Sequence, residues 1–199
     1  MRLTDGFFDV PPGKIAAVVT SLEMRERPPA RPGPTNPSWV LRQVERPDPA
    51  WYRALFRHVG AAWLWSSRLE LADAALAAII CDPLVEVRAL AVDGRDEGLL
   101  ELDFRTAGEC ELGFFGVSPS LVGSGAGRWL MNHAIAGAWS RAITRFWVHT
   151  CTLDHPGALA FYMRSGFRPF RRQIEIANDP RLAGLLPVES APHHPVIRD

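Results

Sequence analysis

Lysine and cysteine are scarce in this chain of 199 residues. Lys14 is the only lysine, so arginine supplies nearly all of the positive charge, and 22 basic residues balance 22 acidic ones. The resulting net charge of zero argues against a nucleic-acid partner. Cys81, Cys110 and Cys151 are odd in number, widely spaced and without a C-x-x-C pair. We therefore expect no disulfide framework and no metal site.

Long apolar runs are also missing. No run approaches the ~18 residues that a bilayer-spanning helix needs. The N-terminal residues 1–14 lack the basic and apolar regions of a secretory signal. We therefore expect a cytoplasmic protein with no membrane partner. Apolar residues still make up 47% of the chain, enough for the core of one ordinary domain.

Two periodicities alternate along the chain and predict a mixed α/β fold. The stretch "DGRDEG" lies between two runs of alternating apolar residues and indicates a β-hairpin. Asp48 and Pro49 are the residue types favoured at a helix N-cap and first helical position. The expected elements are strands at 14–24 and 38–45, helices at 49–59 and 67–82, strands at 85–94, 97–106 and 110–119, a helix at 126–142, a strand at 145–152, a helix at 155–166 and a strand at 167–177.

A proline-rich stretch at 27–37 interrupts this pattern near the start of the chain. Proline has no N–H group and a fixed φ, so the stretch cannot form a helix or a central strand. We expect residues 1–37 to hold an N-terminal strand of the same domain and its connection. Residues 38–180 form the main domain, and the proline-rich residues 181–199 form an extended tail.

The stretch "LVGSGAGRWL" places Gly123, Gly125 and Gly127 between a predicted strand and a predicted helix. The first turn of a helix has free N–H groups and a positive dipole end, which attract phosphate. Glycines let a ligand approach the backbone closely. The alternative is a tight turn that only packs the strand on the helix.

Two familiar phosphate-binding loops fit this stretch poorly. A Walker A loop has Lys and then Ser or Thr after its last glycine, whereas Arg128 and Trp129 follow here. A dinucleotide-binding loop has the spacing G-x-G-x-x-G and an acid about twenty residues later. Here the spacing is G-x-G-x-G, and Asp154 lies further along the chain. A nicotinamide-dependent oxidoreductase therefore stays open as a weaker alternative.

The same loop resembles motif A of the GCN5-related N-acetyltransferases (GNAT), which reads [Q/R]-x-x-G-x-[G/A]. The resemblance implies that backbone amides of this loop hold the pyrophosphate of acetyl-coenzyme A. Val122 departs from the usual Gln or Arg, and Arg128 is a candidate to supply the missing polar contact. The matching residues are Val122, Gly123, Ser124, Gly125, Ala126 and Gly127.

A second segment, "HPGALAFYMRSGF", resembles the family pattern N-x-x-A-x-x-x-Y-x-x-x-G-F. Ala158, Tyr162, Gly166 and Phe167 are in register, and His155 stands where Asn is usual in the coenzyme site. The resemblance covers roughly residues 39–177. It implies a central mixed, mostly antiparallel sheet with a V-shaped splay between the fourth and fifth strands, flanked by about four helices.

The resemblance also implies a chemistry, the transfer of an acetyl group to a primary amine in a ternary complex. Tyr162 matches the tyrosine that protonates the leaving thiolate in many family members. Glu111 matches a strand glutamate that serves as the base through water in some members. His149 titrates near neutral pH and is the other candidate for the base.

The strand before the glycine loop is implied to contact the pantetheine arm. Glu111, Phe115 and Val117 are expected on one face of this strand, because side chains alternate along a strand. The strand is expected to leave its neighbour after Gly116–Val117. Backbone groups at Val117 would then pair with the pantetheine amides, and an N–H group near Phe115–Val117 would polarise the thioester carbonyl.

The amine acceptor is expected near Trp63 and Trp65, in a segment between the first two helices. An aromatic wall suits an apolar or cationic amine; the alternative is a hydrophobic lid on the sheet. The scarcity of acidic residues in this segment argues against a polycationic aminoglycoside. Asp154 and His155 are further candidates to contact the amine or the coenzyme.

Three functions follow from these patterns. The first is a catalytic acetyl-CoA-dependent N-acetyltransferase, which Tyr162 favours. The second is a noncatalytic acyl-CoA-binding protein of the same fold, which the departures at Val122 and His155 favour. The third is the oxidoreductase that would use Asp154. The acceptor's identity stays open, as does the oligomeric state, for which a homodimer is one option.

Overall fold

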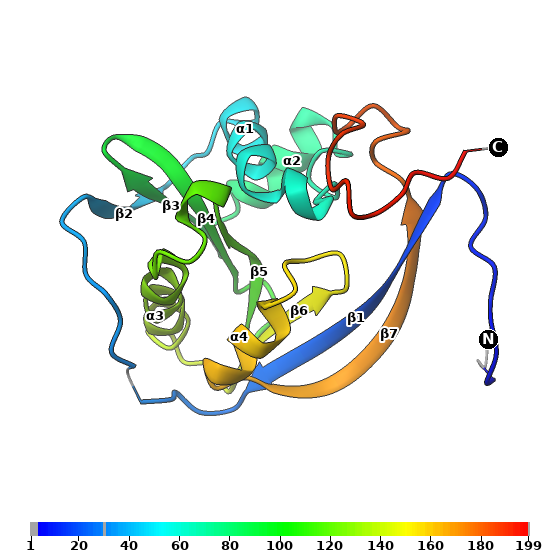
Figure 1. Cartoon of the computed structure of the whole chain (residues 1–199). Helices are drawn as coiled ribbons and strands as arrows, with labels where there is room; N and C mark the ends of the chain where they lie inside the picture. The colour runs from blue at the N-terminus through cyan, green and yellow to red at the C-terminus, as the bar shows by residue number, and fades with distance from the viewer. Residues whose placement is uncertain (1–3, 30, 199) are drawn as a thin grey trace.

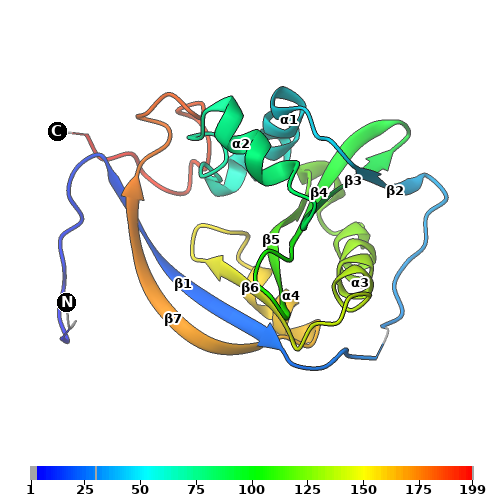
Figure 2. The same ribbon diagram turned by 180° about the vertical axis from the view of Figure 1, so that it is seen from behind.

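The computed structural model describes residues 4–29 and 31–198. In that part of the chain, seven strands form one sheet in the order β2-β3-β4-β5-β6-β1-β7 (Figures 1 and 2). Only β5 and β6 pair in parallel; the other neighbours are antiparallel. The strands are β1 (Lys14–Met24), β2 (Trp39–Val44), β3 (Val85–Val92), β4 (Arg95–Asp103), β5 (Glu109–Val117), β6 (Arg145–Cys151) and β7 (Arg168–Asn178).

Four α-helices flank this sheet, and their order along the chain is the one that the sequence predicts. They are α1 (Pro49–Gly60), α2 (Asp73–Ile80), α3 (Ala126–Ala138) and α4 (Ala158–Arg164). Asp48 caps α1 by accepting hydrogen bonds from the N–H groups of Ala50 and Trp51. The mixed, mostly antiparallel sheet with about four helices is therefore confirmed.

Two helices begin later than the sequence predicts. The expected start of α2 near residue 67 was wrong, because the N–H groups of Leu69 and Glu70 bond to the carbonyl of Ser66 in a turn. The expected start of α4 at residue 155 was also wrong. There the His155 ring Nδ1 accepts the N–H of Gly157 at 2.9 Å.

The N-terminal strand lies inside the sheet, between β6 and β7. The segment before residue 38 thus belongs to the same folded unit as the other strands.

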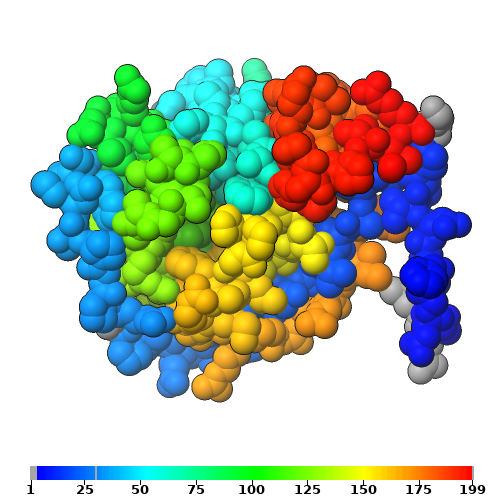
Figure 3. All heavy atoms as spheres, in the orientation of Figure 1, coloured from blue at the N-terminus to red at the C-terminus, as the bar shows by residue number. Residues whose placement is uncertain are grey.

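The C-terminal tail is folded rather than extended, contrary to the prediction. The Arg181 guanidinium pairs with Asp179 and donates to the carbonyls of Ser190 and His194, which bends the tail back onto the α1–α2 region (Figure 3).

Two hydrophobic cores lie on the two faces of the sheet. One packs α3 and α4 on the middle strands, and the other packs α1, α2 and part of the tail on β3 and β4. The first contains Leu22, Leu130, Met131, Phe146, Tyr162 and Phe167, and the second contains Tyr52, Phe56, Val59, Leu76, Leu99 and Leu186.

The splay between β5 and β6 is the feature that creates the site. The two strands pair only where Glu109–Glu111 meet Arg145–Trp147, and beyond that they diverge. They are the fourth and fifth strands when counting starts at β2. The expectation that they part after Gly116–Val117 was wrong, since pairing ends at Glu111.

A β-bulge also changes which side chains of β5 share a face. The pairing with β4 jumps from Leu112 to Phe114, so Gly113 is the extra residue. Leu112 and Phe115 consequently pack on the α3 core, whereas Phe114 packs on the α1 core. The prediction that Glu111 and Phe115 share a face was therefore wrong. Glycine is required at the bulge, because a Cβ at 113 would lie 2.9 Å from Glu101 Oε1.

Candidate active site

One pocket of about 920 Å³ opens in the splay between β5 and β6. That volume lies at the upper end of the range for small-molecule sites. The pocket brings together most of the residues that the sequence singles out, from β5, β6, the glycine loop, α4 and the α1–α2 connection. Those residues are Trp63, Trp65, Glu111, Phe115, Val117, Val122, Gly123, Gly125, Gly127, Arg128, His149, His155 and Tyr162.

Ser124 and Ala126 do not line the pocket. Ser124 Oγ donates to the Leu121 carbonyl at 2.7 Å and accepts the Ala126 N–H at 3.2 Å, so its side chain braces the loop. Ala126 is fully buried beneath it. A direct side-chain contact with a coenzyme is therefore not expected at either position.

The glycine loop presents unpaired backbone donors. Gly123 and Gly125 have φ angles of 82° and 91°, which a residue with a Cβ rarely adopts. Among the described residues, the N–H groups of Gly123, Gly125, Gly127 and Arg128 have no hydrogen-bond partner. A Cβ built on Gly127 would meet no atom within 4 Å. The loop and the first turn of α3 can thus receive an anion.

Arg128 is the charged side chain closest in sequence to these donors. Its guanidinium donates to Ser165 Oγ at 3.0 Å and lies 5.0 Å from the centre of the Phe161 ring. Burial and the neighbouring charges of Arg31 and Arg164 lower its pKa. Val122 is half-exposed and adds no polar group to the loop.

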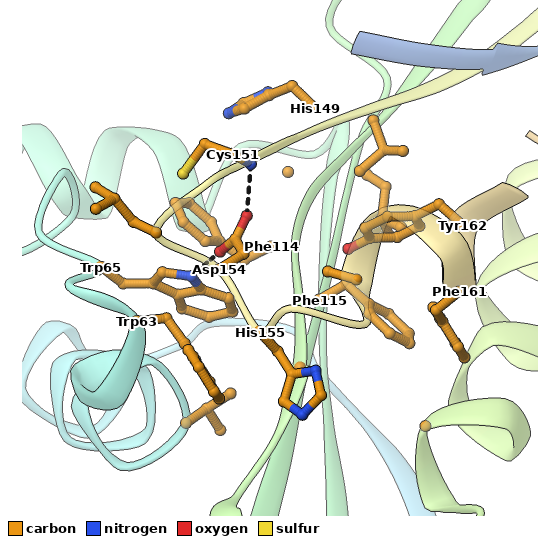
Figure 4. A pocket seen from close by; sticks show the side chains of 18 of the residues that line it. Trp63, Trp65, Phe114, Phe115, His149, Cys151, Asp154, His155, Phe161 and Tyr162 are labelled. Atoms are coloured by element: carbon orange, nitrogen blue, oxygen red, sulfur yellow. Dashed lines mark hydrogen bonds between the residues drawn. The ribbon is translucent and has the colours of Figure 1, made fainter. Parts of the chain in front are cut away.

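Tyr162 reaches the pocket from α4 (Figure 4). The residue is only 7% exposed, and its ring packs against Phe115 and Phe167 with centroids 6.2 and 5.8 Å away. Burial raises the pKa of its hydroxyl well above the ordinary value, and the charge of Asp154 adds to this. Among the described residues, no group hydrogen-bonds to the hydroxyl oxygen. The side chain is therefore a fixed, protonated donor with a free hydrogen.

Glu111 and His149 meet across the point where β5 and β6 part. The distance from His149 Nδ1 to Glu111 Oε1 is 3.5 Å, and the His149 side chain is 51% exposed. The contact with Glu111 raises the pKa of His149; burial opposes this, while the charges of Asp154 and Glu175 add to it. The two predicted base candidates therefore form one coupled pair.

Asp154 links the two walls of the pocket. Its carboxylate accepts hydrogen bonds from Trp65 Nε1 at 3.2 Å, Thr150 Oγ1 at 2.8 Å and the Cys151 N–H at 2.9 Å (Figure 4). These bonds fix the indole of Trp65 against the end of β6. Both carboxylate oxygens are thus engaged within the fold, so the structure adds no support for a dinucleotide role.

Trp63 lies between two histidine rings at the rim of the pocket. Its centroid is 5.1 Å from that of His155 and 6.2 Å from that of His193, which belongs to the folded tail. His155 Nδ1 accepts an N–H two residues ahead, as an Asn side chain does in an Asx turn. The departure from Asn at this position thus keeps the local hydrogen bond.

Four acidic residues line the pocket, and none of them belongs to the segment around Trp63. They come from β4, β5, the β6–α4 connection and β7. They are Asp103, Glu111, Asp154 and Glu175. The scarcity of acids in the segment around Trp63 therefore does not extend to the pocket as a whole. Glu175 was missed because its face on β7 is set by pairing with Ala17 of β1.

A buried ion pair holds Arg68 at the wall of the pocket. Glu101 is fully buried and accepts from Tyr52 Oη at 2.5 Å and from Arg68 Nη2 at 2.6 Å. Arg68 lines the pocket and lies 5.0 Å from the centre of the Phe114 ring. Sequence reasoning missed this cluster, since its members are far apart in the chain.

No group of three or more His, Cys, Asp or Glu in residues 4–29 and 31–198 is arranged to hold a metal ion. Within the same ranges, no helix has the length and apolar character needed to cross a membrane.

The sequence profile of the acetyltransferase (GNAT) family matches residues 37–167, which is more than half of the chain. The chain belongs to the GNAT family. Members of this family typically use acetyl-CoA as the acetyl donor. The match spans the glycine loop and the segment that ends at Phe167, so both resemblances seen in the sequence are confirmed. The comparison with curated protein sequences found no match.

Solved GNAT structures have the same fold at low sequence identity. A GCN5-related N-acetyltransferase from Sphaerobacter thermophilus superposes with a TM-score of 0.59 at 17% identity, covering 85% of this chain and 53% of that protein. One from Kribbella flavida gives 0.52 at 18% identity, covering 86% and 63%. An IAA acetyltransferase from Bacillus cereus gives 0.52 at 21% identity, covering 67% and 79%. The GNAT chain described here thus spans about half of the Sphaerobacter protein.

Proposed function

We propose that this GNAT chain transfers an acetyl group from acetyl-CoA to a primary amine by direct attack in a ternary complex. The observation that carries the proposal is the set of free N–H groups at Gly123, Gly125, Gly127 and Arg128, which share a pocket with the free hydroxyl of Tyr162. The first feature suits the pyrophosphate of the donor. The second suits a leaving thiolate.

The donor would lie along the exposed edge of β5. Beyond Glu111 that edge has no strand partner among the described residues, so its backbone groups can pair with the amides of pantetheine. The pyrophosphate would then receive the loop N–H groups and the charge of Arg128. A backbone N–H near Phe115–Val117 would polarise the thioester carbonyl as negative charge develops on its oxygen.

The acceptor would enter from the opposite end of the pocket. A primary amine is cationic at neutral pH, and the carboxylates of Glu111, Asp154 and Glu175 favour its approach. Trp63 and Trp65 would form an aromatic wall beside it. These features favour an amine over a neutral hydroxyl acceptor.

The chemical step would use the Glu111–His149 pair and Tyr162 as opposite partners. The pair takes a proton from the ammonium group, directly or through water, and frees the nitrogen lone pair. The nitrogen attacks the carbonyl carbon and then loses its second proton, through the same pair to solvent, as the tetrahedral intermediate expels the coenzyme thiolate. Tyr162 donates its proton to that thiolate and is reprotonated from solvent. The products are an amide and free coenzyme A.

The test is release of free thiol from acetyl-CoA across a panel of alkyl amines, polyamines, amino-acid esters and peptides, with mass spectrometry of the products. We expect amine-dependent thiol release that falls strongly in Tyr162→Phe. Arg57→Ala serves as a control, because Arg57 is exposed on α1 and does not line the pocket. Tight acetyl-CoA binding without transfer to any amine would favour the noncatalytic acyl-CoA-binding alternative, for which Val122 is the supporting departure.

A further inference from the structure

The proline-rich connection between β1 and β2 passes along the outside of the molecule on the side of α3 (Figure 1). It is mostly exposed, yet it contacts α3 and the end of α4. Pro34 packs on the glycine loop so closely that a Cβ on Gly125 would lie 2.3 Å from Pro34 Cγ. Asn132 Nδ2 of α3 donates to the Arg31 carbonyl at 3.0 Å. The connection is thus fixed beside the proposed pyrophosphate site.

These contacts bring the Arg31 side chain to the C-terminal end of α4. Its guanidinium Nη1 donates to the backbone carbonyl of Arg164. Arg128 lies on the neighbouring side, bonded to Ser165 and stacked on Phe161. Three arginine side chains from three different segments therefore gather at one edge of the pocket, which Arg128 and Arg164 line.

The charge of this arginine cluster (Arg31, Arg128 and Arg164) is not neutralised within the protein. In the described part of the chain, no carboxylate forms an ion pair with any of the three. The two other arginines that line the pocket do have such partners: Arg68 pairs with Glu101 and Arg105 with Asp103. Burial lowers the pKa of Arg128, and repulsion from the charges of Arg31 and Arg164 lowers it further. An anion bound at the cluster would relieve that repulsion.

We propose that Arg31, Arg128 and Arg164 form a second phosphate site beside the glycine loop, which binds the terminal 3′-phosphate on the ribose of acetyl-CoA. This inference rests on the proposed function. The loop N–H groups suit the singly charged phosphodiester oxygens of a pyrophosphate. A phosphomonoester carries close to two charges and suits guanidinium groups, which donate two parallel hydrogen bonds.

Arg31 lies outside the part of the chain that the family profile matches. It precedes residue 37, where the match begins, and it belongs to the connection that follows β1. The connection would therefore act as a clamp that recognises the nucleotide half of the donor. Selectivity for the 3′-phosphorylated form is the direct consequence.

The experiment compares dissociation constants for acetyl-CoA and 3′-dephospho-acetyl-CoA by titration calorimetry. For the parent chain we expect acetyl-CoA to bind about tenfold or more tightly, which corresponds to about 1.4 kcal/mol. In Arg31→Ala that preference should largely disappear through weaker acetyl-CoA binding, while binding of the dephospho form stays unchanged. Arg31→Lys should retain part of the preference, and Arg57→Ala should retain all of it. Higher salt should reduce the preference, since an exposed ion pair is screened.

Equal binding of the two ligands by the parent chain would overturn the inference, as would an equal loss of both in Arg31→Ala. Inorganic phosphate provides the third arm: if it binds the cluster as tightly as the coenzyme does, the site is a general phosphate site and the assignment to the 3′-phosphate is wrong. Failure of both coenzyme forms to bind would instead refute the proposed function. Thermal melts of each variant confirm that the fold is retained.

Discussion

Replacing Gly127 by aspartate separates donor binding from the stability of the fold. Gly127 lies in the first turn of α3, and a Cβ at this position would meet no atom within 4 Å. Removing a helical glycine stabilises a helix by about 0.5–1 kcal/mol, and a negative charge at the helix N-terminus adds about 0.3–1 kcal/mol. We therefore expect Gly127→Asp to unfold at or above the temperature of the parent chain.

The same carboxylate should exclude the donor. It would occupy the space in front of the free N–H groups of Gly127 and Arg128. Two like charges 4 Å apart repel by about 4 kcal/mol at an effective dielectric constant of about 20. Since each ~1.4 kcal/mol is a tenfold change in affinity, we expect acetyl-CoA to bind at least about a hundredfold more weakly.

Titration calorimetry with acetyl-CoA, beside a thermal melt of each protein, measures both effects. Gly127→Ala is the matched control, because it adds the Cβ without the charge and should lose much less affinity than Gly127→Asp. Parent-like binding by Gly127→Asp would refute the idea that the pyrophosphate lies on this loop. A lowered melting temperature would refute the inference that the position is open.

Three further predictions concern the remaining parts of the pocket. Tyr162→Phe should lower the turnover rate about 100-fold in steady-state assays at an unchanged dissociation constant for acetyl-CoA, since only proton donation is lost. Glu111→Gln should lower the pKa of His149 toward its ordinary value of 6.5, which an NMR titration of the ring measures. In the parent chain the contact with Glu111 raises the pKa of His149, so protonated His149 stabilises the fold at low pH. This stabilisation is lost as the pH rises through the raised pKa. Glu101→Gln should destabilise the protein by about 3 kcal/mol in urea unfolding, because it leaves Arg68 without a counter-charge.

Local patterns of the sequence were enough to predict the order of the elements. Alternation predicts β3 and β4, and the turn between them has positive φ at Asp93 and Gly94, as a tight hairpin requires. The glycine loop and the segment around Tyr162 carried the family assignment. Both are short runs whose residues interact with their sequence neighbours. They can therefore be recognised in the sequence without knowledge of the tertiary structure.

Long-range pairing decided what the sequence could not predict. At the Gly113 bulge, Glu101 of the neighbouring strand fills the space that a Cβ would need. The bulge puts every later residue of β5 on the opposite face from the one that simple alternation predicts. The folded tail depends on Arg181, which donates to carbonyls up to 13 residues away. The side of the sheet that Glu175 faces depends on its pairing with β1. None of these contacts has a local pattern.

We propose that the free N–H groups of the glycine loop hold the pyrophosphate of acetyl-CoA, and a two-dimensional amide NMR titration of the 22.1 kDa protein with acetyl-CoA tests this most directly. We expect saturable shifts that are largest at Gly123, Gly125, Gly127 and Arg128, with slower hydrogen exchange at these four positions. Binding that leaves these amides unchanged, or no binding at all, would contradict it.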